Sequence, residues 1–230
     1  MVWLILLLFL IISLVAFLVW RALPKSHAPT PTRERPDEFQ ATRILFADPE
    51  ILLFEQFLTA EEIEHLKSIA EPRLRRSTIK SGQSDVQSTE RTSESAMLDP
   101  AEDEIVRAIE AKCAALTGYS ISHIEPLQVL RYRGGEHYSP HYDYFQPNEL
   151  AHGGQRHGTL FIYLNDVENG GETWFPELDL SIAPKAGSAA LWYNCDAHGN
   201  PDARLLHGAK PPVDCEKWGV NVWFRQSAFR

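Results

Sequence analysis

Apolar residues form one unbroken run at the beginning of the chain and become periodic after it. From Met1 to Trp20 every residue but one serine is apolar, and about 20 such residues let an α-helix cross a hydrocarbon core of about 30 Å. No basic residues precede this run and no small-x-small site directly follows it, as a cleaved signal peptide would require. Residues 1–20 are therefore predicted to form a single transmembrane anchor.

A polar stretch, residues 21–40, separates the predicted anchor from the rest of the chain. It is rich in Thr, Ser and charged residues, and its four prolines prevent a long helix. The basic residues near the span all follow it, which under the positive-inside rule favours a cytoplasmic position for the remaining domain. A lumenal or periplasmic position is the alternative. We therefore expect a Pro-rich stalk at 21–40 and one domain at 41–230.

The first half of this domain has the signals of one strand and two helices. The run from Ile51 to Phe57 favours a strand, and Thr59 with Glu62 forms a capping box that should begin a helix. A second helix is expected from Pro100 to about Thr117, because proline suits the first helical turn and Gly118 can end the helix.

After these helices the apolar residues come in short runs separated by turn residues. Strands are predicted at Leu127–Tyr132, Thr159–Leu164, Ala189–Tyr193 and Val220–Phe224. Several short strands indicate an antiparallel barrel or sandwich, and helices that precede them should pack on one outer face. The polar segment from Ser77 to Ser95 is predicted to be a mobile loop or a partly formed strand. The expected fold class is α+β.

The composition indicates a globular domain in a reducing compartment. The chain has 230 residues, of which 44% are hydrophobic, enough for a core. The net charge of -9 argues against nucleic acid as a partner, because binding to phosphates rests on clustered Lys and Arg. The three cysteines are too few for a disulfide framework, although a bridge between Cys195 and Cys215 is possible in an oxidising compartment.

His141 and Asp143 are the first candidates for chemistry. Side chains two residues apart project from the same side of an extended strand, so this imidazole and carboxylate can meet a single ion. A second histidine from elsewhere would complete the 2-His-1-carboxylate triad of non-haem iron(II) oxygenases. The pair alone is weak evidence, because a chain with nine histidines produces such pairs often. The alternative is a surface histidine beside a solvated aspartate.

The segments around this pair follow one another in the order of a known family. They are Gln128–Tyr132 before Gly134, Tyr138–Asp143, Arg156 with Thr159, Tyr163–Asp166, Gly170–Thr173, Phe175–Pro176, Pro184–Gly187, and His207 with Glu216–Trp218. This series resembles the prolyl 4-hydroxylase branch (alpha subunit catalytic domain) of the Fe(II)/2-oxoglutarate-dependent dioxygenases over nearly all of residues 127–224. An ordered series across a domain is a much more specific signal than any single motif.

The resemblance implies a fold and a metal site. The fold would be a double-stranded β-helix (jelly-roll) with its core at 127–225 and the helices packed against it. His207 would join His141 and Asp143 as the distal ligand of iron(II). A partly buried strand histidine is the alternative for His207.

The resemblance also implies a co-substrate site. Lys217 would pair with the distal carboxylate of 2-oxoglutarate, and Tyr132 and Thr173 would hydrogen-bond to that carboxylate. The chemistry is consistent, because a buried ammonium needs such a partner. A solvated lysine on an edge strand is the alternative. O2 would be the second co-substrate, and L-ascorbate the reductant that restores the iron.

The resemblance implies hydroxylation of proline in a peptide or protein. The same chemistry on a free amino acid, a lipid or another small molecule is the alternative, because variable loops such as 77–95 and 148–158, the latter a predicted lid, build the substrate groove. A third hypothesis is a membrane-bound sensor or binding module without catalytic activity. Loss of a triad residue would have favoured it. Four histidines receive no metal role: His137, His152, His157 and His198.

Overall fold

Two antiparallel β-sheets pack against each other to form the centre of the protein. The computed structural model describes residues 41–81, 84–146, 150, 152–196 and 198–230. In this part of the chain the larger sheet has the order β1 (Arg43–Ala47), β2 (Glu50–Phe54), β12 (Ala189–Tyr193), β9 (Arg156–Tyr163), β14 (Lys217–Arg225), β7 (Gln128–Tyr132), β6 (Glu94–Met97), β3 (Arg75–Arg76). The smaller sheet has the order β11 (Leu180–Ile182), β10 (Thr173–Phe175), β13 (His207–Ala209), β8 (Tyr138–His141).

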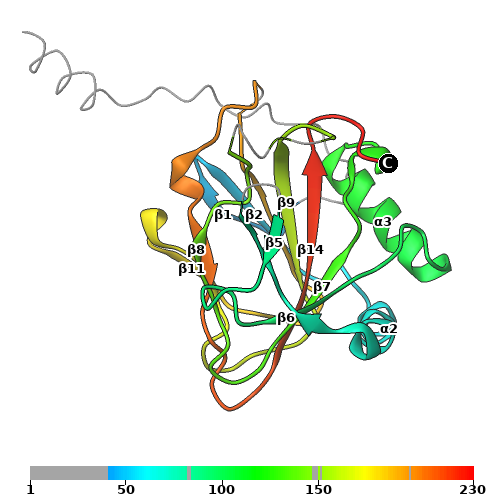
Figure 1. Cartoon of the computed structure of the whole chain (residues 1–230), viewed down its shortest axis with the longest axis vertical. Coiled ribbons are helices and arrows are strands. Elements are labelled where there is room, and N and C mark those ends of the chain that lie inside the picture. The colour runs from blue at the N-terminus through cyan, green and yellow to red at the C-terminus, as the bar shows by residue number, and fades with distance from the viewer. Residues whose placement is uncertain (1–40, 82–83, 147–149, 151, 197) are drawn as a thin grey trace, which may run out of the picture.

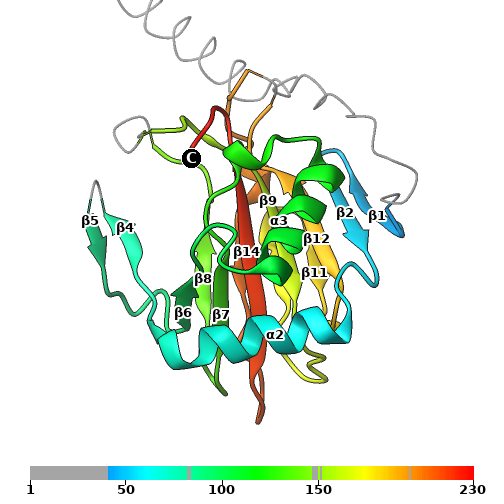
Figure 2. The same cartoon turned by 90° about the vertical axis from the view of Figure 1, so that its right-hand side faces the viewer.

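Two α-helices cover the outer face of the larger sheet. They are α2 (Ala60–Ala70) and α3 (Glu104–Thr117), and both lie against the central strands of that sheet (Figures 1 and 2). Short 3-10 helices occur at Glu71–Arg73, Ile121–His123, Pro176–Leu178 and Ala203–Leu205. The arrangement confirms the predicted antiparallel β core with helices on one outer face.

Local signals explain where these helices begin and end. The capping box predicted before α2 is present: the Thr59 side chain accepts from the backbone N–H of Glu62, and the Glu62 side chain accepts from the backbone N–H of Thr59. The predicted beginning of the second helix at Pro100 is wrong. Asp103 is the N-cap, because its side chain accepts a hydrogen bond from the backbone N–H of Val106. The predicted end is confirmed, since Gly118 caps α3 with a φ of 69°.

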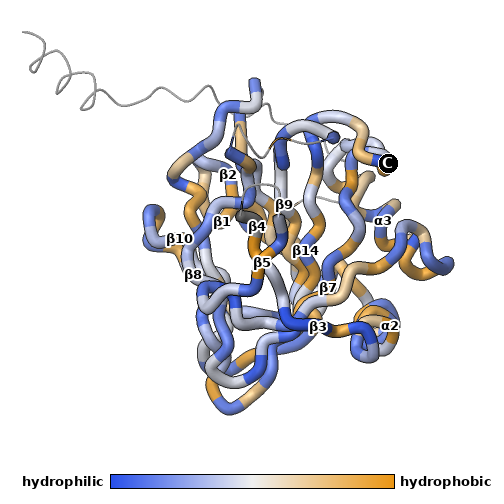
Figure 3. The backbone as a smooth tube through the Cα atoms, in the orientation of Figure 1, coloured by the Kyte–Doolittle hydropathy of each residue, from blue (hydrophilic) through white to orange (hydrophobic). Residues whose placement is uncertain are grey.

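Side-chain alternation along β9 separates two apolar cores. Leu160 and Ile162 belong to the cluster beneath the helices, whereas Phe161 and Tyr163 pack with Phe175 between the two sheets. Figure 3 shows apolar residues along the central strands and α3. The functional site lies in the core between the sheets.

The N-terminal part of the domain differs from the sequence prediction in two places. The strand expected to reach Phe57 ends at Phe54, because Gln56 has a φ of 58° and turns the chain. The segment 77–95, expected as a loop or a partly formed strand, contains a hairpin of β4 (Ile79–Ser81) and β5 (Ser84–Val86) before β6 begins.

The predicted anchor and stalk, residues 1–40, lie outside the described residues. Among the described helices, none is both long enough and apolar enough to cross a bilayer. The transmembrane segment therefore stays a prediction.

The cysteines of the described chain are free. Cys195 follows β12, which ends opposite Gly158 of β9, whereas Cys215 precedes the end of β14 that lies opposite Tyr163. These two ends are several residues apart, and each strand residue adds about 3.3 Å. That separation exceeds the reach of a disulfide, so a Cys195–Cys215 bridge does not form in this fold.

Candidate iron and 2-oxoglutarate site

Three potential metal ligands converge at one end of the smaller sheet. His141 ends β8 and pairs directly with His207, the first residue of β13. The prediction that Asp143 shares a strand with His141 is wrong, because Asp143 lies in a bend just after β8. The three residues nevertheless offer ligand atoms that all lie within 4.8 Å of one another. The bend therefore achieves the convergence that a strand was expected to provide.

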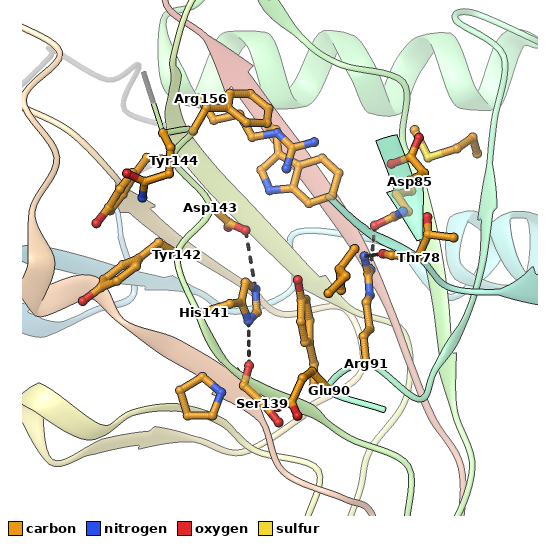
Figure 4. Close-up of a pocket in the computed structure, with 18 residues that line it drawn as sticks. Thr78, Asp85, Glu90, Arg91, Ser139, His141, Tyr142, Asp143, Tyr144 and Arg156 are labelled. Carbon is orange, nitrogen blue, oxygen red and sulfur yellow. Dashed lines mark hydrogen bonds and ion pairs between the residues drawn. The ribbon is translucent and has the colours of Figure 1, made fainter. Parts of the chain in front are cut away.

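Backbone carbonyl groups fix the orientation of both histidines. Nδ1 of His141 lies 2.9 Å from the oxygen of Ser139, and Nδ1 of His207 lies 2.9 Å from the oxygen of Leu205. A dashed line in Figure 4 marks the contact between His141 and Ser139. Because a carbonyl oxygen only accepts, Nδ1 donates in each ring and Nε2 keeps its lone pair. The Nε2 atoms lie 3.6 and 3.5 Å from the carboxylate oxygens of Asp143. Both rings are thus held with Nε2 available to a metal.

Burial and proximity set the charges of these ligands. Burial and, to a smaller extent, the charge of His207 lower the pKa of His141 to about 4. Burial alone would raise the pKa of Asp143, but the two neighbouring histidines outweigh burial and hold that pKa well below its usual value. A neutral imidazole and an ionised carboxylate are the forms that bind a metal ion. Two imidazoles and one carboxylate fit iron(II).

A narrow cavity connects this triad to Lys217. Its volume is about 30 Å³, and its lining includes Lys217, Tyr132 and Thr173 together with the three potential metal ligands. Lys217 begins β14 and pairs directly with Tyr132 of β7. Thr173 begins β10 and pairs with Ala209 of β13, the strand that also carries His207. Strand register thus brings the residues predicted to bind the co-substrate to the residues predicted to bind the metal.

Among the described residues, no carboxylate contacts the ammonium group of Lys217. Its side chain is 0% exposed, and its Nζ has no hydrogen-bond partner in the described structure. Burial lowers its pKa to about 7, and the more distant charge of Glu172 offsets part of that effect. The surrounding groups are aromatic rings, with centroids 5.0–5.7 Å from Nζ. A carboxylate entering the cavity would supply the missing partner, so these residues fit a dicarboxylate that also reaches the metal.

Known proteins share this fold and these segments. Residues 127–225, the span predicted as the core, match the family model of the 2OG-Fe(II) oxygenase superfamily. Prolyl 4-hydroxylase 5 of Arabidopsis thaliana is 37% identical over 206 residues, which cover 80% of this chain and 70% of that protein. The chain belongs to the prolyl 4-hydroxylase branch of the 2OG-Fe(II) oxygenase superfamily.

Two further members of this branch extend the comparison. Prolyl 4-hydroxylase subunit alpha-1 of Mus musculus is 38% identical over 185 residues, covering 77% of this chain but 35% of that longer protein. The crystal structure of a viral collagen prolyl hydroxylase from Paramecium Bursaria Chlorella virus-1, as a 2OG complex, aligns with a TM-score of 0.63 at 29% identity. The alignment covers 76% of this chain and 95% of the viral one. The likeness confirms the predicted family and its jelly-roll core.

A second, wider pocket of this oxygenase also borders two of the three potential metal ligands, His141 and Asp143. Its volume is about 580 Å³, and its wall contains the five aromatic residues Tyr138, Tyr142, Tyr144, Phe145 and Trp223. The ring of Tyr138 stacks on His141 with centroids 3.5 Å apart. Figure 4 shows the triad residues His141 and Asp143 on the wall of this pocket. The pocket therefore offers an aromatic surface directly beside the predicted iron.

A buried ion network supports one wall of this pocket. Arg156 donates to both carboxylate oxygens of Glu125 at 2.7 and 2.8 Å, and Arg225 donates to the same carboxylate at 2.9 Å. The guanidinium of Arg156 lies 3.6 Å from the centre of the Trp223 ring. Figure 4 shows Arg156 among the side chains that line the pocket. The family resemblance included Arg156, but its sequence neighbours gave no indication of Glu125 as its partner.

The structure also separates the other histidines from the triad. The predicted loop 148–158 ends earlier than expected, because β9 begins at Arg156 and includes His157, whose ring bonds to Tyr119 and to the backbone oxygen of Asp196. Residues 147–149 and 151 of that predicted lid lie outside the described residues. Within the described chain, the one group that could hold a metal is the triad.

One residue near the co-substrate cavity was missed by sequence reasoning. The hydroxyl of Tyr163 donates to Oγ1 of Thr173 at 2.9 Å. The signal that would have found it is the alternation along β9, because Tyr163 follows Phe161 by two residues and so shares its inward face. Tyr163 leaves the Thr173 hydroxyl hydrogen free to bond to a ligand.

Proposed function

We propose that the protein hydroxylates proline in a peptide or protein, using iron(II), 2-oxoglutarate and O2. The observation that carries this proposal is the buried, unpartnered ammonium of Lys217 in the same cavity as the triad of His141, Asp143 and His207. A triad alone would fit many metal sites. A triad next to a buried cation fits a co-substrate that chelates the metal with its keto-acid end and offers a second carboxylate to the cation.

The chain's own residues hold the reactants in place. When bound, iron(II) would supply the activation of O2 and the oxidation of a C–H bond. The triad would hold the metal and leave positions open for the co-substrate and O2. Lys217 would pair with the distal carboxylate, and Tyr132 and Thr173, which line the same cavity, would hydrogen-bond to it through their hydroxyl groups. The buried surroundings exclude water from that charge pair.

The wide pocket favours a peptide substrate. Its wall is aromatic on several sides, and aromatic grooves bind proline-rich segments in the extended polyproline conformation. Relatives that share the family are named prolyl 4-hydroxylases, and the viral relative is named a collagen prolyl hydroxylase. These names and the pocket support proline over other substrate residues.

Turnover of 2-oxoglutarate with candidate substrates tests the proposal. The full chain, supplied with iron(II), should convert 2-oxoglutarate to succinate faster when a proline-rich peptide is present, and mass spectrometry should find one added oxygen atom on a proline. His141→Ala and Lys217→Ala should abolish the stimulated turnover. His198→Ala, which alters an exposed histidine, is the matched control and should retain it.

The same assay separates the substrate classes. Free amino acids, lipids and other small molecules form a second panel at matched concentration. Stimulation by that panel alone would replace the peptide with a small-molecule substrate and leave the chemistry intact. Full activity in His141→Ala would contradict the metal assignment itself.

We further propose that L-ascorbate reduces the iron back to iron(II) after unproductive turnover. A second proposal is that residues 1–20 anchor the enzyme in a membrane, with the catalytic domain on the cytoplasmic side. The apolar run and the basic residues after it support the second proposal. Ascorbate should prolong linear turnover in the assay above. The full chain should sediment with membranes and resist extraction by high salt, and protease added outside sealed cells should leave the domain intact.

A further inference from the structure

A buried hydroxyl group holds the carboxylate of the metal triad. Thr159, on the inward face of β9, donates through Oγ1 to Oδ2 of Asp143 at 2.7 Å. Thr159 is 0% exposed and Asp143 is 7% exposed. A hydrogen bond to an ionised acceptor is stronger than a neutral one, and a dry environment strengthens it further. The orientation of Asp143 therefore depends on a residue of the larger sheet.

Asn194 determines the direction of that hydroxyl. Its Nδ2 lies 2.9 Å from Oγ1 of Thr159 and 3.3 Å from the backbone oxygen of Arg156. The backbone oxygen can only accept, so it is the amide nitrogen of Asn194 that faces both atoms. Thr159 therefore accepts from Asn194, and its single hydroxyl hydrogen is left for Asp143.

The backbone of Asn194 also reaches the distal histidine. Its oxygen accepts from the N–H of Asp202 at 3.0 Å, and the oxygen of Asp202 accepts from the N–H of Leu205 at 3.1 Å. The oxygen of Leu205 is the group that fixes Nδ1 of His207, at 2.9 Å. Asn194, itself 1% exposed, thus connects by hydrogen bonds to two of the three metal ligands.

We infer that Thr159 and Asn194 are positioning residues that hold Asp143 with one carboxylate oxygen turned to the metal. Oδ1 lies 3.6 Å from Nε2 of His141, and Oδ2 lies 3.5 Å from Nε2 of His207. Because Oδ2 already accepts the hydrogen bond from Thr159, Oδ1 is the oxygen that would bind the ion. Coordination through one oxygen preserves the open positions that the co-substrate and O2 require. The inference rests on the metal-binding part of the proposed function and is independent of the substrate.

Direct titration with cobalt(II) tests the inference without turnover. The full chain, freed of metal, is titrated in the absence of 2-oxoglutarate, and the dissociation constant and the visible absorption of the bound ion are recorded. Thr159→Val removes the hydroxyl at nearly constant shape and should weaken binding about tenfold or more, as loss of such a partner commonly does. Thr159→Ser keeps the hydroxyl and should restore both the affinity and the absorption spectrum.

Two further variants complete the design. Asn194→Ala retains its own backbone oxygen and the Thr159 hydroxyl but loses the amide that directs this hydroxyl, so it should also weaken binding. Thr117→Val is the matched control, because Thr117 is equally buried and its hydroxyl donates within α3, to the oxygen of Cys113. It should bind cobalt(II) like the wild type.

The inference is overturned if Thr159→Val keeps the wild-type affinity, or if Thr159→Ser or Thr117→Val loses as much affinity as Thr159→Val. If Thr159→Val does not fold, Asn194→Ala decides, and wild-type affinity in that variant overturns the inference. A different pattern marks failure of the proposed function. In that case the wild type binds no metal, or His141→Ala binds it as tightly as the wild type does.

Discussion

Lys217 and Tyr132 lie opposite each other on β14 and β7, and the Nζ atom of Lys217 is 5.3 Å from the centre of the Tyr132 ring. No hydrogen-bond acceptor reaches this Nζ within the described residues, although the side chain is completely buried. Burying an ammonium without a partner costs stability, and an anion that arrives in the cavity removes that cost. If Lys217 pairs with 2-oxoglutarate as proposed, binding of the co-substrate should stabilise the folded protein.

Replacing Lys217 with methionine should stabilise the free protein while it disables the site. Methionine fills similar space without charge, so the free energy of unfolding at about pH 6 should rise by about 1–4 kcal/mol. The loss of the cation should weaken 2-oxoglutarate binding by about 2–5 kcal/mol. Denaturant unfolding measures the first effect, and calorimetric titration measures the second.

Lys210→Met is the matched control for this variant. The Nζ of Lys210 lies 3.3 Å from the Ser181 hydroxyl at the surface, so its replacement should change the free energy of unfolding by less than about 0.5 kcal/mol. A Lys217→Met protein that is less stable than the wild type would contradict the cost assigned to the buried ammonium.

The pKa of Lys217 predicts how co-substrate affinity depends on pH. Burial lowers this pKa from 10.5 to about 7. Binding of a carboxylate selects the ammonium form, so affinity for 2-oxoglutarate should fall as pH rises above about 7, by up to about tenfold per pH unit. Calorimetric titration in buffers of different ionisation enthalpy should detect uptake of a proton. Constant affinity from about pH 6 to 9 would exclude a lysine that titrates in this range.

The lowered pKa of Lys217 also predicts that the free energy of unfolding of the protein without co-substrate increases with pH, whereas its affinity for 2-oxoglutarate decreases. Between pH about 7 and 10.5 the unfolded chain binds a proton at Lys217 that the folded chain does not. The contribution of Lys217 to the free energy of unfolding therefore rises with pH across this window. The difference in unfolding free energy between wild type and Lys217→Met should shrink as pH increases. Denaturant unfolding at several pH values measures it, and a constant difference would contradict the shift.

Removal of the Asp143 carboxylate should abolish stabilisation by metal. An ion that binds only the folded chain raises the free energy of unfolding by about 2.7 kcal/mol at a concentration one hundredfold above Kd. Manganese(II) should therefore raise the thermal midpoint of the wild type, and a chelator should reverse the rise. Asp143→Ala should show neither effect, whereas Glu168→Ala, which removes an exposed carboxylate, should behave like the wild type.

Loss of Glu125 should destabilise the protein, because the buried guanidinium of Arg225 and the half-buried guanidinium of Arg156 share its buried carboxylate. Glu125→Ala should lower the free energy of unfolding by about 3–5 kcal/mol in denaturant. The control Glu71→Ala removes the exposed partner of Arg131, 3.4 Å away, and should cost less than about 1 kcal/mol. An equal loss of unfolding free energy in Glu125→Ala and Glu71→Ala would contradict the larger contribution assigned to the buried ion pairs.

Acid should remove the contribution of Glu125. Burial raises the pKa of this carboxyl, but the charges of Arg156 and Arg225 outweigh burial and bring it below the ordinary 4.5. Because this pKa is depressed in the folded state, the stabilisation is complete above pH about 4.5 and is lost as pH falls below it. The difference in unfolding free energy between wild type and Glu125→Ala should therefore decrease on acidification.

Sequence motifs predicted those features of the fold that depend on residues close together in the chain. The capping box of Thr59 and Glu62 is such a case, because its hydrogen bonds span three residues. The beginning of α3 shows the limit of this reasoning. Pro100 and Asp103 both suit a helix N-terminus, and the structure uses Asp103, whose side chain reaches the N–H of Val106.

The sequence by itself determined the antiparallel β core with helices on one outer face and, through its ordered family segments, the family; it also nominated the six candidate site residues. Only the tertiary structure decided how His207 meets His141 and how Lys217 comes to be buried without a hydrogen-bond partner among the described residues. It also decided that Thr159 bonds to Asp143 and Asn194 to Thr159. The physical reason is that strand register and burial arise from packing two sheets together. Contacts between residues far apart in the chain leave no periodic trace in the sequence around either one.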